Sequence, residues 1–254
     1  MITFENVSYT YPEGVKAIKG VTLTLRDGEF VGLIGHSGAG KTTLAKLAVG
    51  LLKPQEGRVL VDGLDTRRVP VSDLARHVGY VFQNPELMIF SHTIYDEIAF
   101  ALRNLGVPES EIRERVVRAL EQVDLGDKPL DTPPYALSFG EKHRLAIASV
   151  LVMEPRTIIL DEPTTGLDYG RCLKLFEILK RLRDEGRTVV LITHDIDLLA
   201  RYADRIVVLE GGRVVRDGPA REVLGDLEFL ESHGFVPTQV LLLARELGLD
   251  AITP

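Results

Sequence analysis

The 254-residue chain has little cysteine, no excess of basic charge and no long apolar run. Its single cysteine, Cys172, can form neither an intrachain disulfide nor a thiolate metal cluster, so we expect a small packed residue on a helix face. The net charge of −7 argues against a general nucleic-acid-binding surface. No window approaches the ~20 apolar residues of a membrane-spanning helix, and no basic-then-apolar segment opens the chain. We therefore expect a cytosolic chain without a nucleic-acid partner.

What the chain does contain is a glycine-rich octet between a strand pattern, Phe30–Ile34, and a helical one. The octet consists of Gly35, His36, Ser37, Gly38, Ala39, Gly40, Lys41 and Thr42. Such a loop aims successive backbone N–H groups and a helix N-terminus at one anion, while Lys41 would reach the β- and γ-phosphates and Thr42 would ligate Mg²⁺. A glycine-rich turn that only joins a strand to a helix is the structural alternative. The strand before and the helix after favour a nucleoside triphosphate site.

Hydrophobic spacing separates strand-forming parts of the chain from a helical middle. Two-residue alternation and turn signals over residues 2–25 predict antiparallel strands, and residues 57–63 and 78–82 predict further strands. From residue 84 to about 153 the spacing becomes helical, most clearly at Ile112, Val116, Leu120 and Val123. We expect a helical subdomain inserted there.

The last hundred residues predict parallel strands followed by a hairpin. Apolar strands at 157–160 and 188–192 flank a helical pattern, an order that implies parallel pairing with a right-handed crossover. Strand patterns at 205–209 and 213–215 flank the turn Glu210-Gly211-Gly212 and predict a hairpin. Beyond Gly225 we expect a mostly helical tail.

An acidic pair, Asp161 and Glu162, ends the buried strand 157–160. Carboxylates at this edge of a parallel sheet face the cleft where ligands bind. Asp161 could hold Mg²⁺, commonly through water, and Glu162 could polarise the water that attacks the γ-phosphate. Acidic residues that only cap the next segment are the alternative, and the glycine-rich octet elsewhere in the chain weighs against it.

The chain resembles the ATP-binding cassette (ABC) superfamily, because further motifs follow that family's order along residues 1 to about 225. Leu137-Ser138-Phe139-Gly140-Glu141 occupies the place of the LSGGQ signature, and Thr165-Gly166-Leu167-Asp168 resembles the D-loop. Gln83 matches the Q-loop, His194 the switch histidine, and Tyr11 the aromatic residue that stacks on adenine. Each residue alone has an ordinary explanation, such as a helix cap or a satisfied strand end. Their ordered occurrence favours the family.

The resemblance implies an α/β P-loop NTPase (ABC ATPase) fold with a mixed core sheet, an N-terminal antiparallel β-subdomain and an inserted α-helical subdomain. Residues 1–225 would form the ATPase domain, with residues 84–153 as the helical subdomain, and residues 226–254 a dimerisation segment. ATP and Mg²⁺ would bind between two such domains arranged head-to-tail, each phosphate loop facing the other's signature. The resemblance assigns catalytic roles to Glu162, His194, Gln83 and Asp168; metal contacts to Thr42, Gln83 and Asp161; and nucleotide contacts to Tyr11, the octet Gly35 to Thr42, Thr43, Ser138 and Gly140.

Within the superfamily, the stretch that begins Gln83-Asn84-Pro85 and continues through residues 86–107 resembles the energy-coupling factor (ECF) transporter ATPases, which include cobalt and vitamin uptake systems. This likeness implies ATP-driven uptake of a micronutrient. It implies a transmembrane coupling subunit and a solute-binding membrane subunit as partners, with the chain peripheral on the cytoplasmic face of the cell membrane.

The signature departs from the family pattern in two positions, Phe139 for glycine and Glu141 for glutamine, and Met88 stands where the ECF group often has glutamine. A carboxylate beside a triphosphate could cost a few kcal/mol at an effective dielectric constant of about 20, unless it points away or pairs with Lys142 or Arg144. A homodimer would carry this defect twice. We therefore expect a heterodimer with a second homologous ATPase, and a homodimer is the alternative.

Three other functions are compatible with part of this pattern. The chain could be the ATPase subunit of another ABC importer or exporter. It could be a low-activity regulatory partner that binds ATP, as Phe139 and Glu141 suggest and the intact Glu162 argues against. An ATPase that clamps DNA or ribosomes is disfavoured, because the chain has neither a long coiled-coil insertion nor a second cassette.

Overall fold

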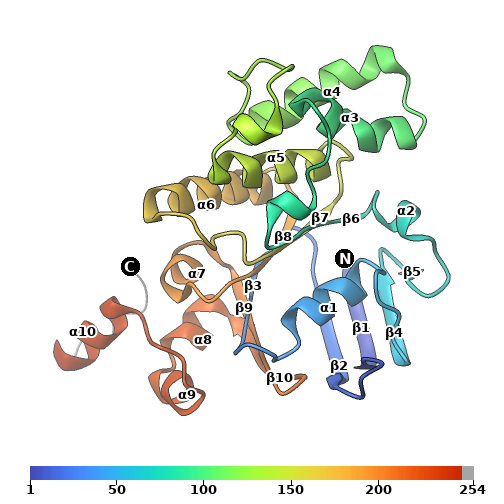
Figure 1. The fold of residues 1–254 in the computed structure, drawn as a ribbon. Helices are drawn as coiled ribbons and strands as arrows, with labels where there is room; N and C mark the ends of the chain where they lie inside the picture. Colours follow the sequence, from blue (N-terminus) through green and yellow to red (C-terminus); the bar gives the residue numbers. More distant parts are fainter. Residues whose placement is uncertain (248–254) are drawn as a thin grey trace.

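The computed structural model describes residues 1–247, and its strands form two sheets (Figure 1). The first sheet has the order β2-β1-β4-β5 and is antiparallel throughout. Its strands are β1 (Ile2–Thr10), β2 (Lys16–Leu25), β4 (Glu56–Val61) and β5 (Leu64–Asp65). The predicted antiparallel strands at the start of the chain are thereby confirmed.

The second sheet has the order β10-β9-β3-β8-β7-β6, and only β10 runs antiparallel to its neighbour. Its strands are β3 (Phe30–Ile34), β6 (Val78–Val81), β7 (Thr157–Asp161), β8 (Thr188–Ile192), β9 (Arg205–Glu210) and β10 (Arg213–Pro219). Every residue of β3, β7 and β8 is buried, as expected for parallel strands that are covered on both faces. The predicted parallel pairing of β7 with β8 and the β9–β10 hairpin are confirmed.

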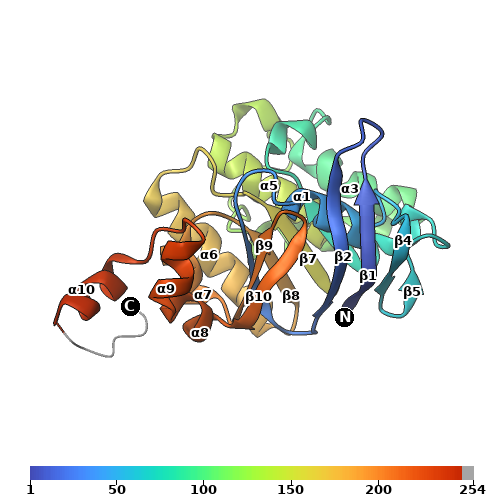
Figure 2. The same ribbon diagram turned by 90° about the horizontal axis from the view of Figure 1, so that it is seen from below.

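The helices cover the second sheet and extend beyond it (Figures 1 and 2). They are α1 (Lys41–Ala48), α2 (Val71–Leu74), α3 (Ile94–Asn104), α4 (Glu109–Gln122), α5 (Phe139–Leu151), α6 (Tyr169–Asp184), α7 (Ile196–Tyr202), α8 (Ala220–Gly225), α9 (Leu227–Ser232) and α10 (Gln239–Leu247), with 3₁₀ turns at Pro85–Leu87 and Pro134–Ala136. The helical spacing in the middle of the chain corresponds to α4, where Ile112, Val116 and Leu120 are fully buried. Cys172 is buried on α6, as expected.

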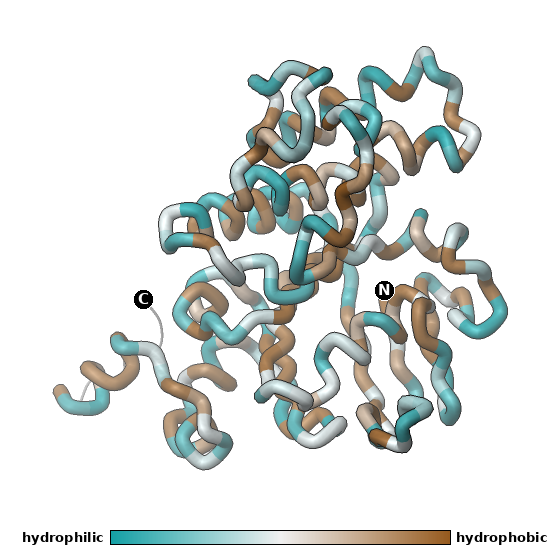
Figure 3. Tube along the Cα trace, viewed as in Figure 1, coloured by the Kyte–Doolittle hydropathy of each residue, from teal (hydrophilic) through white to brown (hydrophobic). Residues whose placement is uncertain are grey.

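Strand β3 separates two hydrophobic cores. Phe30 and Ile34 point into the core made with helices α3 to α9, whereas Val31 and Leu33 point into the core made with α1 and the antiparallel sheet. Figure 3 shows the hydrophobic positions gathered along the strands at the centre of the molecule. The carboxyl ends of β3, β7 and β8 lie at one edge of the sheet because these strands are parallel, and that edge is where ligands bind in such sheets.

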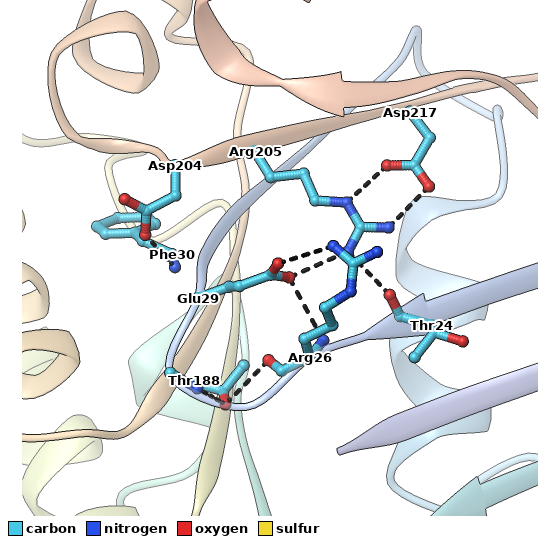
Figure 4. Close-up of polar contacts among 9 residues, drawn as sticks. Thr24, Arg26, Glu29, Phe30, Thr188, Asp204, Arg205 and Asp217 are labelled. Carbon is cyan, nitrogen blue, oxygen red and sulfur yellow. Dashed lines mark hydrogen bonds and ion pairs between the residues drawn. The ribbon is translucent and has the colours of Figure 1, made fainter.

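A network around Arg205 ties the two sheets together at the opposite edge (Figure 4). The Arg205 guanidinium is paired with Asp217 at 2.6 Å and with Glu29 at 3.0 Å, and it donates to the Thr24 carbonyl at 2.9 Å. Beside it, Asp204 accepts a hydrogen bond from the Phe30 amide. Residues from β2, β9, β10 and the loop before β3 are thus joined at the amino ends of the parallel strands.

Candidate nucleotide-binding site

The glycine-rich octet joins the end of β3 to the start of α1. A Cβ at Gly35 would lie 2.3 Å from the Leu209 carbonyl oxygen, so only glycine allows this close approach to β9. Helix α1 begins after Gly40, which provides no side-chain cap. The first N–H groups of α1 are therefore available to an anion in the loop.

Lys41 is folded onto the loop that precedes it. Its Nζ donates hydrogen bonds to the carbonyl oxygens of Gly35, at 2.6 Å, and His36, at 3.1 Å. Burial lowers the pKa of Lys41, and the nearby charges of Glu162 and Asp161 partly oppose this effect. The ammonium group is thus held in the loop by neutral carbonyls, which a triphosphate can replace with a stronger charge-assisted interaction.

Asp161 ends β7 and receives two hydroxyl groups. Its Oδ2 accepts hydrogen bonds from Thr42 Oγ1 at 2.7 Å and from the Tyr80 hydroxyl at 2.9 Å. Burial, followed by the charge of Asp161, raises the pKa of Tyr80, so the phenol stays a donor. The hydroxyl oxygen and the carboxylate are hard oxygen donors of the kind that Mg²⁺ prefers, and they fit a magnesium ion. Within residues 1–247 no group of three or more His, Cys, Asp or Glu side chains could hold a metal ion.

Glu162 and His194 face each other across the ends of β7 and β8. His194 Nδ1 donates to Glu162 Oε2 at 2.9 Å; the carboxylate side chain is 16% exposed and the imidazole 78% exposed. Glu162 has a left-handed backbone (φ 47°), and its N–H bonds to the Ile192 carbonyl. Asn6, Asp62, Asp124 and Glu154 have the same backbone conformation, so it does not by itself mark a functional position. With the octet residues Gly35 to Ser37 and with Lys41, the pair lines a cavity of about 540 Å³.

Tyr11 lines a second cavity, of about 310 Å³, on the other side of the octet. Its hydroxyl lies 3.1 Å from Thr43 Oγ1, and its ring is edge-on to Tyr9 at a centroid distance of 5.0 Å. Gly211 and Gly212 of the β9–β10 hairpin also line this cavity. The sequence did not indicate their contribution.

The signature lies in a different part of the chain. Ser138 caps α5 and forms a reciprocal capping box with Glu141. Glu141 also pairs with Lys128 at 2.7 Å, and these contacts lower its pKa to about 2. Of the two relieving arrangements considered from the sequence, Glu141 does not show the ion pair with Lys142 or Arg144. Lys142 pairs with Glu86 of the Pro85–Leu87 turn, and Arg144 bonds to the carbonyls of residues 123 and 124.

Phe139 and His143 connect the signature to its neighbours. A Cβ at Gly166 would lie 3.1 Å from the Phe139 ring, so the ring lies against the D-loop, and it packs edge-on against His143. His143 is fully buried, with Nε2 3.2 Å from the Gln83 carbonyl oxygen, and its burial lowers its pKa. The Q-loop residue thus contacts the signature helix through its backbone.

One chain therefore gathers some of the predicted site residues and leaves others apart. The residues around the 540 Å³ cavity come together, whereas Ser138 and Gly140 line a separate cavity of about 230 Å³ with Arg171. Asp168 caps α6 by accepting from the Arg171 amide at 2.9 Å. The structure thus places the signature residues and the phosphate-loop residues in different cavities.

Comparison with known proteins agrees with this geometry. The ABC transporter family model matches residues 18–165. The chain belongs to the ABC transporter family. The fold predicted from the resemblance, an ABC ATPase cassette with a mixed sheet, is confirmed by solved cassettes. CbiO1 from Clostridium perfringens, described as part of the ABC transporter complex cbiONQ, is 36% identical with a TM-score of 0.83, and each chain covers 98% of the other.

Two further comparisons define the cassette more closely. MJ0796, solved as a dimer in a post-hydrolysis state with ADP and Pi, is 33% identical with a TM-score of 0.77, covering 87% of this chain and 99% of its own. The energy-coupling factor transporter ATP-binding protein EcfA2 of Caldanaerobacter subterraneus subsp. tengcongensis is 41% identical over 97% of this chain and 88% of its own length. This chain also spans only 41% to 43% of the length of other curated ABC transporter ATP-binding relatives that it matches.

Proposed function

We propose that this cassette hydrolyses ATP to drive uptake of a micronutrient, a vitamin or a transition-metal ion, through an ECF-type transporter. The observation that carries the proposal is the cavity where Lys41 meets the hydrogen-bonded pair Glu162 and His194. This cavity offers a cation for a triphosphate and a carboxylate for a water molecule. The likeness to EcfA2 and CbiO1 supports the ECF assignment.

In this mechanism the triphosphate takes the N–H groups of the octet and the start of α1, and Lys41 turns from the loop carbonyls to the β- and γ-phosphates. Glu162 accepts a hydrogen bond from the attacking water, and His194 holds the carboxylate in place. Thr42 and Asp161 would hold Mg²⁺ together with Gln83, and the ion would neutralise developing charge on the phosphate oxygens. Tyr11 would stack on adenine beside Thr43.

We further propose that the active unit is a head-to-tail dimer in which Ser138, Gly140 and Asp168 serve the partner's nucleotide. The separation of the signature cavity from the phosphate-loop cavity supports this arrangement. A heterodimer with a homologous ATPase remains our proposal. It now rests on Phe139, because the Lys128 pair and the capping box hold Glu141 back from a facing phosphate.

Residues 1–225 would be the ATPase domain, with residues 84–153 as its helical subdomain, and residues 226–254 would form a dimerisation segment, of which residues 248–254 lie outside the described part. An apolar stripe supports the last assignment. Val236, Val240, Leu243 and Leu247 recur at helical spacing and are 77%, 39%, 56% and 62% exposed. Helix α10, which carries most of the stripe, lies at the edge of the molecule (Figure 2). Such a stripe is suited to a partner helix.

A second apolar surface supports attachment to a transmembrane subunit. Leu87, Phe90, Phe100 and Tyr135 are exposed large hydrophobic residues, and Phe90 and Tyr135 line a hollow of about 230 Å³ on the helical subdomain. We propose that this surface receives coupling helices of a membrane partner, which would hold the cassette at the cytoplasmic face and beside a solute-binding subunit. In residues 1–247 we find no helix with the length and hydropathy of a membrane span.

The test compares wild type with Glu162→Gln. We expect single-turnover ATP hydrolysis to fall about 10²- to 10⁴-fold in Glu162→Gln, because the water loses its base while ATP binding is kept. With ATP and Mg²⁺ the variant should form a dimer, alone or with a homologous cassette, as measured by mass in solution. Equal hydrolysis rates would show that Glu162 is idle and would favour the regulatory alternative.

A further inference from the structure

The segment after α9 touches the phosphate loop directly. The rings of His36 and Phe235 are stacked, with centroids 5.1 Å apart and an interplanar angle of 7°. His36 Nε2 also donates to the His233 carbonyl oxygen at 2.7 Å. His36 is the second residue of the octet, so a residue almost 200 positions later in the chain contacts the phosphate-binding element.

This contact is anchored in the core of the cassette. The Phe235 amide donates to the Leu230 carbonyl at 2.8 Å, which ends α9 with Gly234 in a left-handed conformation (φ 70°). A Cβ at Gly234 would lie 3.3 Å from His36 Nε2, so glycine also permits the close approach. Leu230 is fully buried and Asp226 caps α9. The backbone of Phe235 is therefore held by a hydrogen bond to a buried residue at the end of a capped helix.

The other side of His36 leads to the nucleotide. Its carbonyl oxygen accepts a hydrogen bond from Lys41 Nζ, so the residue that stacks on Phe235 also holds the lysine that must turn to the phosphates. Residues 234–237 line the same cavity of about 540 Å³ as Glu162 and His194. The segment thus forms one wall of the nucleotide site.

We propose that Phe235 is a positioning residue for ATP: by stacking on His36 it orders the phosphate loop before ATP binds, so that the C-terminal segment sets nucleotide affinity. This inference rests on the proposed ATPase function. Offset-stacked aromatic pairs with this geometry are worth about a two- to tenfold change in an equilibrium constant. The role is in binding and not in the chemical step, so it should act on affinity and leave the rate at saturation unchanged.

The experiment measures the dissociation constant of ATP in the Glu162→Gln background, and KM and kcat in the wild-type background, for replacements of Phe235. We expect Phe235→Ala and Phe235→Leu to raise the dissociation constant and KM two- to tenfold with kcat unchanged, and Phe235→Tyr to retain wild-type values. Leucine fills much of the volume without a ring and guards against an effect of cavity formation. Phe229→Ala is the matched control, because Phe229 lies on the preceding helix α9 and its ring packs against His233 and Arg216 and not against the His36 ring.

A double-mutant cycle separates direct contact from general disturbance. In a His36→Ala background, replacing Phe235 by alanine should have no further effect on affinity. A lowered melting temperature with unchanged ATP affinity would make Phe235 a structural residue only, and an effect that persists without His36 would overturn the proposed contact. If wild type binds no ATP, the proposed function fails instead, which is a different result from equal affinities of wild type and Phe235→Ala.

Discussion

The polar side chains at the two edges of the parallel sheet differ in how completely they are paired. At the amino ends Arg205 is 11% exposed and is fully engaged by Asp217, Glu29 and a backbone carbonyl. At the carboxyl ends Lys41 bonds only to carbonyls of its own loop, and Glu162 has a left-handed backbone. Strand β3, five residues long, lies between the two arrangements, because Glu29 precedes it and the octet follows it.

This difference shows how the cassette separates stability from function. A residue with a strained backbone and a cation with weak partners both lower the stability of the fold. They persist only where the surrounding structure holds them in place. The Arg205 network and the two cores provide that support from residues that need not contact ATP. Replacements at the two edges should therefore affect different measurements.

The largest effect is expected at the carboxyl edge with His194→Ala. The Glu162 carboxylate loses the donor that orients it, so kcat should fall by about 10²-fold or more. The melting temperature should stay near that of wild type, because the imidazole is 78% exposed. Steady-state hydrolysis and thermal unfolding of the same preparation check both points. A melting temperature well below that of wild type would show that His194 stabilises the fold, which would contradict the proposed difference between the two edges.

The next effect is expected at the amino edge with Arg205→Ala. Removing the guanidinium leaves Glu29 and Asp217 without their shared partner, which should lower the free energy of unfolding by about 3 kcal/mol. KM for ATP in the folded fraction should not change. Urea denaturation measures the first quantity, with Arg58→Ala as the control because Arg58 makes only an exposed pair with Glu5. Comparable losses in both variants would contradict the special role of the network.

A smaller effect is expected from Tyr80→Phe, which removes one of the two hydroxyl donors to Asp161. Groups that hold a metal ligand typically change metal affinity by about tenfold or more, so the Mg²⁺ concentration for half-maximal hydrolysis should rise about tenfold. Tyr95→Phe is the control, since that hydroxyl bonds to Glu109 at the surface. An unchanged Mg²⁺ requirement would show that Tyr80 only supports the strand.

The parts of the site that sequence reasoning predicted are those whose residues are consecutive or keep a fixed order. The octet carries its own strand, turn and helix signals, so its fold follows from local patterns. The pairing of β7 with β8 followed from the strand–helix–strand order, because crossover handedness leaves few topologies.

The contacts that sequence reasoning missed join residues that are distant in the chain. Tyr80 reaches Asp161 across 81 positions and His36 reaches the 233–235 turn across 197. No local pattern encodes either contact, although a tyrosine in a buried strand does call for a polar partner. The conformation of Glu141 could be predicted in part, because Ser138 and Glu141 have the spacing of a capping box. Its ion pair with Lys128 could not, because that pair depends on the path of the loop before α5.

The bridges from α5 to the loop after β6 have a mechanical consequence. His143 bonds to the Gln83 carbonyl, and Lys142 pairs with Glu86 three residues further along. Two adjacent residues of one helix thus hold two points of one loop, so rotation of the loop about one contact is opposed by the other. A displacement of the Pro85–Leu87 turn should therefore be shared by the start of α5, where both contacts are made.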